Sequence, residues 1–291
     1  MANLKEVRNR IASVNSTQQI TKAMKMVAAA KLRKAQDAII QMRPFAQKLG
    51  EMLQTVSAGT EVQSPYKEER AIEKVLIVVV TSDRGLCGAF NANVSKAATV
   101  LINEKYAALK AAGNVKIMSV GRKGGEFFKR RAYTVNDKYE ETFTHLSFDY
   151  VRNAAEEIMQ GFLEGHYDVV EIVYNEFKNV ATQVIRTEQF LPIQSSEAAQ
   201  SEVKGDYIFE PSEEEIIKEL IPKSLKIQLY RAVLESNASE HGARMTAMDK
   251  ATDNAGELLK NLRIEYNRSR QAAITTEILE IVGGAEALAA N

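Results

Sequence analysis

Apolar residues recur three and four positions apart along the start of the chain, from Leu4 to Val56. A mean spacing of 3.5 residues keeps one stripe of a helix facing a partner helix, as in a left-handed coiled coil. Thirteen of the sixteen positions in this seam are apolar, and the other three are consecutive. The pattern predicts one helix of roughly 80 Å, at about 1.5 Å per residue. The seam consists of Leu4, Val7, Ile11, Val14, Gln18, Thr21, Lys25, Ala28, Leu32, Ala35, Ile39, Met42, Ala46, Leu49, Leu53 and Val56.

Residues 74–193 show a different pattern, in which short apolar runs alternate with amphipathic stretches. The run Val75–Val80 is wholly aliphatic, which is typical of a strand covered on both faces. Strands that alternate with helices predict a layered, Rossmann-like α/β domain with a largely parallel sheet. The expected strands are 75–80, 115–120, 169–174 and 184–191, and the expected helices are 91–112, 123–131 and 150–164.

A polar stretch without periodicity, residues 194–211, precedes a second long helical pattern. Ser212 is a suitable N-cap for this helix, because the acidic residues that follow it would lie in the first turn. Pro222 should break or kink the start of the helix, whereas the apolar spacing continues through Pro44 and predicts only a kink or short break there. The second seam consists of Met248, Ala251, Ala255, Leu258 and Leu262, and then shifts by one residue to Tyr266.

These patterns divide the chain into a coiled-coil helix (1–58), an α/β domain (74–193), a connecting loop (194–211) and a C-terminal helix with an apolar tip (212–291). Since both long helices adjoin the inserted domain, an antiparallel coiled coil is the simplest way for each to bury its seam. The lengths differ, so Leu4 should lie opposite residues 265–275, and the tip should project alone. Its many apolar side chains need other protein around them. The chain is therefore expected to work inside a larger assembly.

Charge is balanced over the whole chain, with 38 basic and 38 acidic side chains, so the net charge gives no reason to expect nucleic acid as a partner. Residues 1–56 nevertheless carry a net charge of +7, and residues 57–211 and 212–291 carry −4 and −3. A basic arm indicates an acidic partner, pairing with the acidic end, or simply a solvated helix. No aliphatic run approaches the roughly 20 residues that span a bilayer. Cys87 is the only cysteine, so no internal disulfide forms.

Candidate chemistry in the α/β domain is weak. Cys87 lies in a glycine-flanked turn after a strand, but no sequence pattern brings a histidine base to it. Gly121, Gly124 and Gly125 match neither common phosphate-binding motif, and no cluster of His, Cys, Asp or Glu has metal-ligand spacing. We therefore expect no catalytic, cofactor or metal site. An α/β enzyme with a coiled-coil oligomerisation arm and a structural tether stay open as alternatives.

Four blocks of sequence stand out along the chain: ITKAMKMVAAAK (20–31), DRGLCG (83–88), ARMTAMDKATDNA (243–255) and NRSRQAAITTEILEIVGGAEAL (267–288). Together, and in this order, they resemble one family, the gamma subunits of F-type ATP synthases. The resemblance is most specific in the two arms.

The resemblance implies a central rotor shaft that couples proton or sodium flow through a membrane ring of c subunits to ATP synthesis or hydrolysis on beta subunits. The chain itself would not be catalytic and would need no cofactor. Its partners would be the alpha and beta subunits of the head, the epsilon subunit and the c ring. It would reach the membrane only through the c ring, on the cytoplasmic face of a bacterial inner membrane.

The resemblance also implies which residues meet these partners. Met24 and Lys25 would face the acidic lever loop of a beta subunit, and Tyr207 and Glu210 would lie against the c ring. Further contacts with beta subunits along the shaft would come from Arg244, Arg270, Gln271 and Thr275. The chain departs from the family at Gly283, where many members have serine, and it lacks the cysteine-bearing insert that gives thiol control to chloroplast members. Lys25 adds a positive charge where some members carry an acid.

Overall fold

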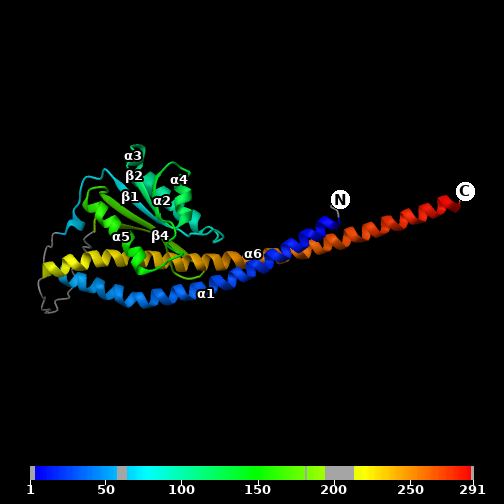
Figure 1. Cartoon of the computed structure of the whole chain (residues 1–291), viewed down its shortest axis with the longest axis horizontal. Coiled ribbons are helices and arrows are strands. Elements are labelled where there is room, and N and C mark those ends of the chain that lie inside the picture. The colour runs from blue at the N-terminus through cyan, green and yellow to red at the C-terminus, as the bar shows by residue number, and fades with distance from the viewer. Residues whose placement is uncertain (1–3, 58–63, 181, 194–212, 290–291) are drawn as a thin grey trace. The chain divides into compact units, whose positions relative to one another are not determined.

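The computed structural model describes residues 4–57, 64–180, 182–193 and 213–289. Its longest elements are α1 (Leu4–Ser57) and α6 (Glu213–Ala289), and a five-stranded sheet with its helices lies between them in the sequence (Figure 1). The chain forms two compact units. The α/β unit comprises Ala28–Arg244, and the arm unit comprises Met1–Val27 with Met245–Asn291.

The sheet of the α/β unit has the strand order β3-β2-β1-β4-β5. Four strands are parallel, and β5 pairs antiparallel with β4, so the predicted largely parallel sheet is confirmed. The four predicted strands are present, and the third extends further than predicted, to Phe177. The strands are β1 (Val75–Val80), β2 (Val115–Val120), β3 (Thr134–Tyr139), β4 (Val169–Phe177) and β5 (Gln183–Leu191).

Strand β3 was not predicted. Its sequence, TVNDKY, is mostly polar, because β3 is the edge strand and pairs only with β2. Edge strands bury little surface and often carry charged side chains that discourage further pairing. Lys129 holds Asp137 of β3 at 2.5 Å, so these polar residues are part of the folded surface.

The helices of the inserted region agree with the prediction apart from one interruption. The expected helix over 91–112 is divided at Tyr106, which leaves helical geometry with φ −128°. The interruption allows the Tyr106 hydroxyl to donate to Glu171 Oε1 at 2.8 Å, and Lys105 Nζ lies 2.5 Å from the same buried carboxylate. The helices are α2 (Phe90–Lys105), α3 (Ala107–Ala111), α4 (Arg122–Lys129) and α5 (Phe148–Leu163), with a short 3₁₀ helix at Pro65–Lys67.

Helices cover both faces of the sheet. On one face, α2 and α4 pack on alternate side chains of β1, including Val75, Ile77 and Val79. On the other face, α5 and the first half of α6 pack on Leu76 and Val78 (Figure 1). Alternate burial of this kind is what a fully aliphatic central strand requires.

Within the α/β unit, α6 is enclosed from two sides. Leu225, Leu229 and Val233 belong to the core beneath the sheet, whereas Leu234 and Ala238 pack on Leu32, Ala35 and Ile39 of α1. Pro44 and Pro222 lie inside their helices without a break, so the break considered at either proline is absent. The proposed cap Ser212 lies outside the described residues.

The predicted seam of α1 is confirmed wherever side chains are described. Its fourteen described positions, from Leu4 to Leu49, are all buried or half-buried. The fully buried side chains of α1 all belong to the seam: Val7, Thr21, Ala28, Leu32, Ala35, Ile39 and Leu49.

In the arm unit, α1 and α6 form the predicted antiparallel pair, because Lys25 contacts Asp249 and Thr21 contacts Thr252. The predicted α6 seam was wrong at Leu258, which is 40% exposed, while Leu259 is buried. With Leu259 and Thr252 included, the alternation of four and three residues continues through Tyr266 without a shift. The corrected seam is Met248, Thr252, Ala255, Leu259, Leu262, Tyr266 and Ser269, all buried or half-buried.

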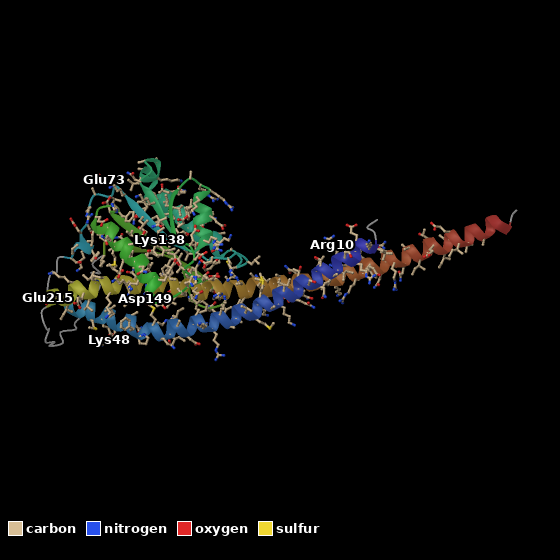
Figure 2. All side chains as sticks on the ribbon, in the orientation of Figure 1. Arg10, Lys48, Glu73, Lys138, Asp149 and Glu215 are labelled. Atoms are coloured by element: carbon tan, nitrogen blue, oxygen red, sulfur yellow. The ribbon has the colours of Figure 1, made fainter. Side chains whose placement is uncertain are left out.

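Beyond Ser269, every side chain of α6 is exposed as far as Ala285. Figure 2 shows these side chains pointing outward with no other element of the arm unit beside them. The predicted unpaired tip is therefore confirmed over residues 270–285. Its large exposed apolar side chains are Ile274, Ile278, Leu279, Ile281 and Val282.

Gly121, at the end of β2, is a position where no other residue fits. Its φ is +96°, and a Cβ would overlap the carbonyl oxygen of Thr81. We expect Gly121→Ala to lower the free energy of unfolding by about 3 kcal/mol or more, because left-handed strain and overpacking add. Gly113→Ala is the matched control: φ is +76°, but nothing lies within 4 Å of its Cβ, so only about 1 kcal/mol of strain applies. Urea denaturation of the full chain measures both, and equal losses would contradict this explanation.

His241, on the buried part of α6, should make stability depend on pH. Burial, together with the positive charges of Arg244 and Lys31, lowers the pKa of His241 to about 4. Between pH 6.5 and 4 the unfolded chain binds a proton at this histidine that the folded chain does not bind. The free energy of unfolding therefore decreases as the pH is lowered, by at most about 3 kcal/mol. His241→Gln should remove this part of the acid sensitivity. Unfolding free energies at pH 7, 5.5 and 4.5 test this, and parallel pH curves for both proteins would contradict it.

Candidate functional site

The three consecutive polar positions of the α1 seam meet polar partners on α6. Lys25 Nζ lies 2.5 Å from Asp249 Oδ1, and Thr252 Oγ1 lies 2.8 Å from Thr21 Oγ1. Gln18 Nε2 donates to the carbonyl oxygen of Thr252 at 3.4 Å. We call these five residues the polar interlock. A buried polar pair at seam positions specifies the register of a coiled coil, at some cost in stability.

Lys25 is thus engaged inside the arm unit as well as available to a partner. Its side chain is 40% exposed and that of Asp249 is 47% exposed, so the ion pair contributes at most about 1 kcal/mol. Met24, beside it, is half-buried. Ile20 and Val27, four residues before and three after Met24, are 60% and 56% exposed. This apolar stripe was missed in the sequence, because it lies outside the seam that dominates the pattern.

Arg270, Gln271 and Thr275 all lie on the unpaired tip and are exposed. Thr275 Oγ1 donates to the carbonyl oxygen of Gln271 at 2.9 Å, as threonine does inside a helix. The structure thus places these three predicted contact residues together, next to the apolar side chains of the tip.

Arg244 lies in the α/β unit, in a different environment from the tip residues. Its side chain is only 11% exposed and forms an ion pair with Glu240. Its Nη2 also donates to the carbonyl oxygens of Arg84 and Gly85, at 3.0 Å each. The guanidinium therefore connects α6 with the turn that follows β1. Tyr207 and Glu210, the predicted c-ring contacts, lie outside the described residues.

Cys87 is buried in that turn, against Phe90 and Ala243. Asn91 Nδ2 lies 3.2 Å from its sulfur, and no hydrogen bond joins Cys87 to a histidine in the described part of the chain. Burial raises the pKa of the thiol, whereas a nucleophilic cysteine needs a lowered pKa. Cys87 is a packed side chain with no catalytic geometry.

The glycines near α4 serve packing. Gly124 N donates to Thr81 Oγ1 at 2.7 Å, and Lys123 N donates to the carbonyl oxygen of Ser82 at 3.0 Å. A Cβ on Gly125 would collide with Glu140. The amides that a phosphate would need are therefore already used, and an acidic side chain lies against them.

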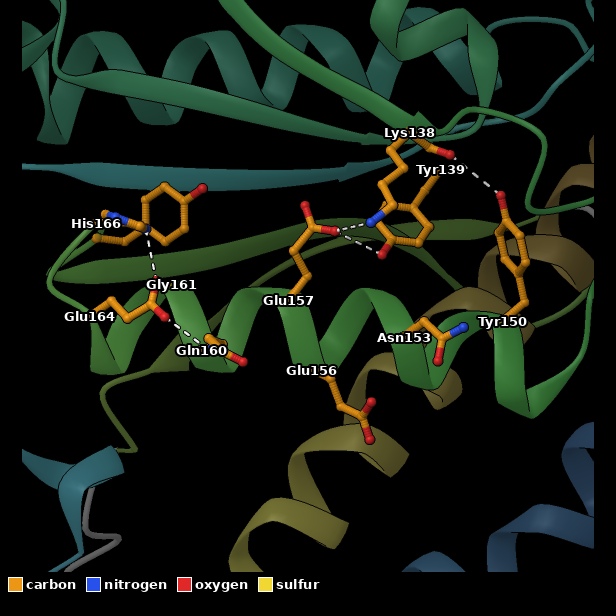
Figure 3. A pocket seen from close by; sticks show the side chains of 11 residues that line it. Lys138, Tyr139, Tyr150, Asn153, Glu156, Glu157, Gln160, Gly161, Glu164 and His166 are labelled. Carbon is orange, nitrogen blue, oxygen red and sulfur yellow. Dashed lines mark hydrogen bonds and ion pairs between the residues drawn. The ribbon is translucent and has the colours of Figure 1, made fainter.

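An open groove of about 650 Å³ lies between α5 and β3 (Figure 3). Its acidic side chains are all engaged. Glu157 accepts hydrogen bonds from Lys138, Tyr139 and Asn136, which outweigh burial and lower its pKa. Glu156 pairs with Lys226 of α6 at 2.7 Å, and Glu164 accepts from Gln160 at 2.8 Å. The groove offers no free carboxylate for acid–base chemistry.

A second groove, of about 400 Å³, runs along the arm unit where Gly256 leaves space beside Gln18. Lys260 and Arg263 line it and are exposed, so its charge is basic. Over the residues that the structure describes, no His, Cys, Asp and Glu side chains gather as three or more potential metal ligands. None of the helices in that part of the chain is long and apolar enough to cross a membrane.

Comparisons with known proteins agree over the whole length of the chain. A family model described as ATP synthase matches residues 3–288. The ATP synthase gamma chain of Cytophaga hutchinsonii is 63% identical over 293 residues, and 99% of each chain is covered. The gamma chain of Flavobacterium johnsoniae is 55% identical over 290 residues, again with 99% of each chain covered.

Solved structures are similar as well. A chain in the central stalk and c-ring structure of Tetrahymena thermophila mitochondrial ATP synthase is 28% identical, with a TM-score of 0.55 over 80% of this chain and 99% of that one. A chain in an OSCP/F1/c-ring structure of Euglena gracilis mitochondrial ATP synthase has the same fold, with a TM-score of 0.70, 22% identity and coverage of 98% and 94%. Relatives of equal length, the paired helical arms and the inserted α/β fold together show that this chain belongs to the family of ATP synthase gamma chains.

Proposed function

We propose that this chain is the central rotor shaft of an ion-driven ATP synthase and is itself not catalytic. The observation that carries the proposal is the unpaired tip, residues 270–285, in which five large apolar side chains are exposed on a single helix. Such a surface needs surrounding protein. The similar Tetrahymena chain belongs to a central stalk that is solved with its c-ring, which supports the same place for this chain.

The proposed partners are the alpha and beta subunits of the head, the epsilon subunit and the c ring. Met24 and Lys25 would meet the lever loop of a beta subunit, with Ile20 and Val27 extending the apolar part of that contact. Arg270, Gln271 and Thr275 would meet beta subunits around the tip. Tyr207 and Glu210 would meet the c ring, through which alone the chain would reach the cytoplasmic face of a bacterial membrane.

The proposed division of the chain follows from these contacts. The helices of residues 1–58 and 212–291 would form the shaft, the domain of residues 74–193 would provide a broad base, and residues 194–211 would lie at its foot. Arg244 is also proposed to act on a beta subunit, although its guanidinium is already bound to the turn after β1.

A shaft made of two unlike helices presents a different face to each of three catalytic sites as it turns. Moving one site between two states from 1:99 to 99:1 requires about 5.5 kcal/mol of differential interaction. One exposed ion pair contributes about 0–1 kcal/mol, so many contacts along the shaft must share the coupling.

The direct test of the proposed function is the subunit composition of the native complex. We expect purification through a tag on this chain to yield one copy with three alpha and three beta subunits, as measured by intact-complex mass spectrometry. Recovery of the chain alone or as a homo-oligomer would overturn the proposal and favour an enzyme or a tether.

A chain that lacks residues 278–291 should give complexes that dissociate at lower temperature but still hydrolyse ATP, because the tip acts mainly as an apolar bearing.

Lys25→Ala should reduce ATP-driven rotation without abolishing it, because coupling is distributed. The matched variant Asp249→Asn removes the same ion pair but leaves the charge of Lys25 in place. It should therefore reduce rotation less than Lys25→Ala does. Single-molecule rotation of the assembled head measures both variants. Complete loss of rotation in an intact Lys25→Ala complex would contradict distributed coupling, and equal losses in both variants would assign the effect to the polar interlock instead of the partner.

A further inference from the structure

The turn after β1, residues 83–88, holds an unusual backbone conformation. Leu86 has φ 65° and Gly88 has φ 62°. Left-handed geometry costs a residue with a side chain about 1–2 kcal/mol and persists only where the surroundings enforce it. Leu86 is nevertheless 65% exposed, so its own side chain packs too little to enforce the conformation. The restraint must come from other groups.

One restraint lies on the strand side of the turn. Asn91 Oδ1 accepts from Ser82 N at 2.9 Å, and Ser82 Oγ donates to the carbonyl oxygen of Arg84 at 2.6 Å. Asn91 Nδ2 also reaches Cys87 Sγ at 3.2 Å. These bonds fix the two ends of the turn, but they leave the carbonyl of Gly85 free.

The second restraint comes from α6, about 160 residues further along the chain. Arg244 Nη2 donates to the carbonyl oxygens of Arg84 and Gly85, while Nη1 bonds to Glu240. We call this arrangement the Arg244 bridge. Only the planar, forked guanidinium can reach a carboxylate and two carbonyls at once, which a lysine ammonium on a flexible stem does not reproduce.

Glu240 orients the bridge. Its side chain is 6% exposed, and its Oε2 has no hydrogen-bond partner in the described part of the chain. A buried carboxylate is costly unless a cation neutralises it, so Glu240 holds the guanidinium in place. Ala243, the residue before Arg244, packs with Cys87 and Phe90 in one buried cluster.

We propose that Arg244 is a positioning residue that locks the turn of residues 83–88 to α6. The Arg244 bridge keeps Arg84, Gly85 and Leu86 in one exposed conformation, so that a force applied to this surface is transmitted directly to the last helix. The bridge is a property of the isolated chain and does not depend on the proposed function. If Arg244 acts on a beta subunit as proposed above, it would do so through the surface that it holds.

The native cysteine reports on the bridge, because Cys87 is buried under the turn and is the only thiol. We compare the rate at which a maleimide labels Cys87 in the full chain with the rate of amide exchange in β4, which reports global opening. Arg244→Gln and Arg244→Lys should both raise the labelling rate about tenfold or more, since charge-assisted hydrogen bonds are lost. The exchange of β4 should stay within about twofold of the native rate.

Arg33→Lys, on an exposed position of α1, is the matched control and should change neither rate. Arg244→Lys distinguishes the hydrogen bonds of the bridge from the effect of a positive charge alone, because it keeps a cation beside Glu240 but loses the forked guanidinium. Labelling that stays at the native rate in both Arg244 variants would overturn the proposal. Labelling that rises only in proportion to β4 exchange would also overturn it, since Arg244 would then stabilise the whole unit and not the turn.

Discussion

The enclosure of α6 is the constraint on which the rest of the α/β unit depends. From Ile221 to Ala243 this helix is packed by the sheet and α5 on one side and by α1 on the other. A helix that is buried on most of its circumference has no polar face to place in water. Charged residues on it are therefore costly unless they are neutralised within the protein, as in the ion pairs of Arg244 with Glu240 and of Arg231 with Glu188.

The arm unit shows the opposite situation, because most of the surface of its two helices faces solvent. There the seam alone provides the burial, and the polar interlock interrupts it at Gln18, Thr21 and Lys25. An apolar seam can slide by one heptad at small cost, whereas a displaced Lys25 or Thr252 would face apolar side chains. Polar residues in the seam thus fix which part of α1 faces which part of α6.

The sequence predicted those features that follow from one dominant pattern. The α1 seam and the aliphatic strands were correct, because burial there repeats at a fixed period. Among the features that escaped are the polar edge strand β3, the choice of Leu259 over its equally apolar neighbour Leu258, and the internal bonds of Arg244. Each depends on a partner distant in the sequence, and no local period reports such a partner. The contact surfaces for other subunits came from resemblance, since exposed side chains such as Arg270 and Thr275 carry no pattern of their own.

The unpaired tip has a mechanical consequence. Two helices joined by a packed seam resist bending together, because bending one requires its side chains to shear past the other. From residue 270 onward a single helix carries any load, with only its own backbone hydrogen bonds to resist. The arm unit is therefore most compliant at the tip, which can bend without forcing the paired region to bend with it.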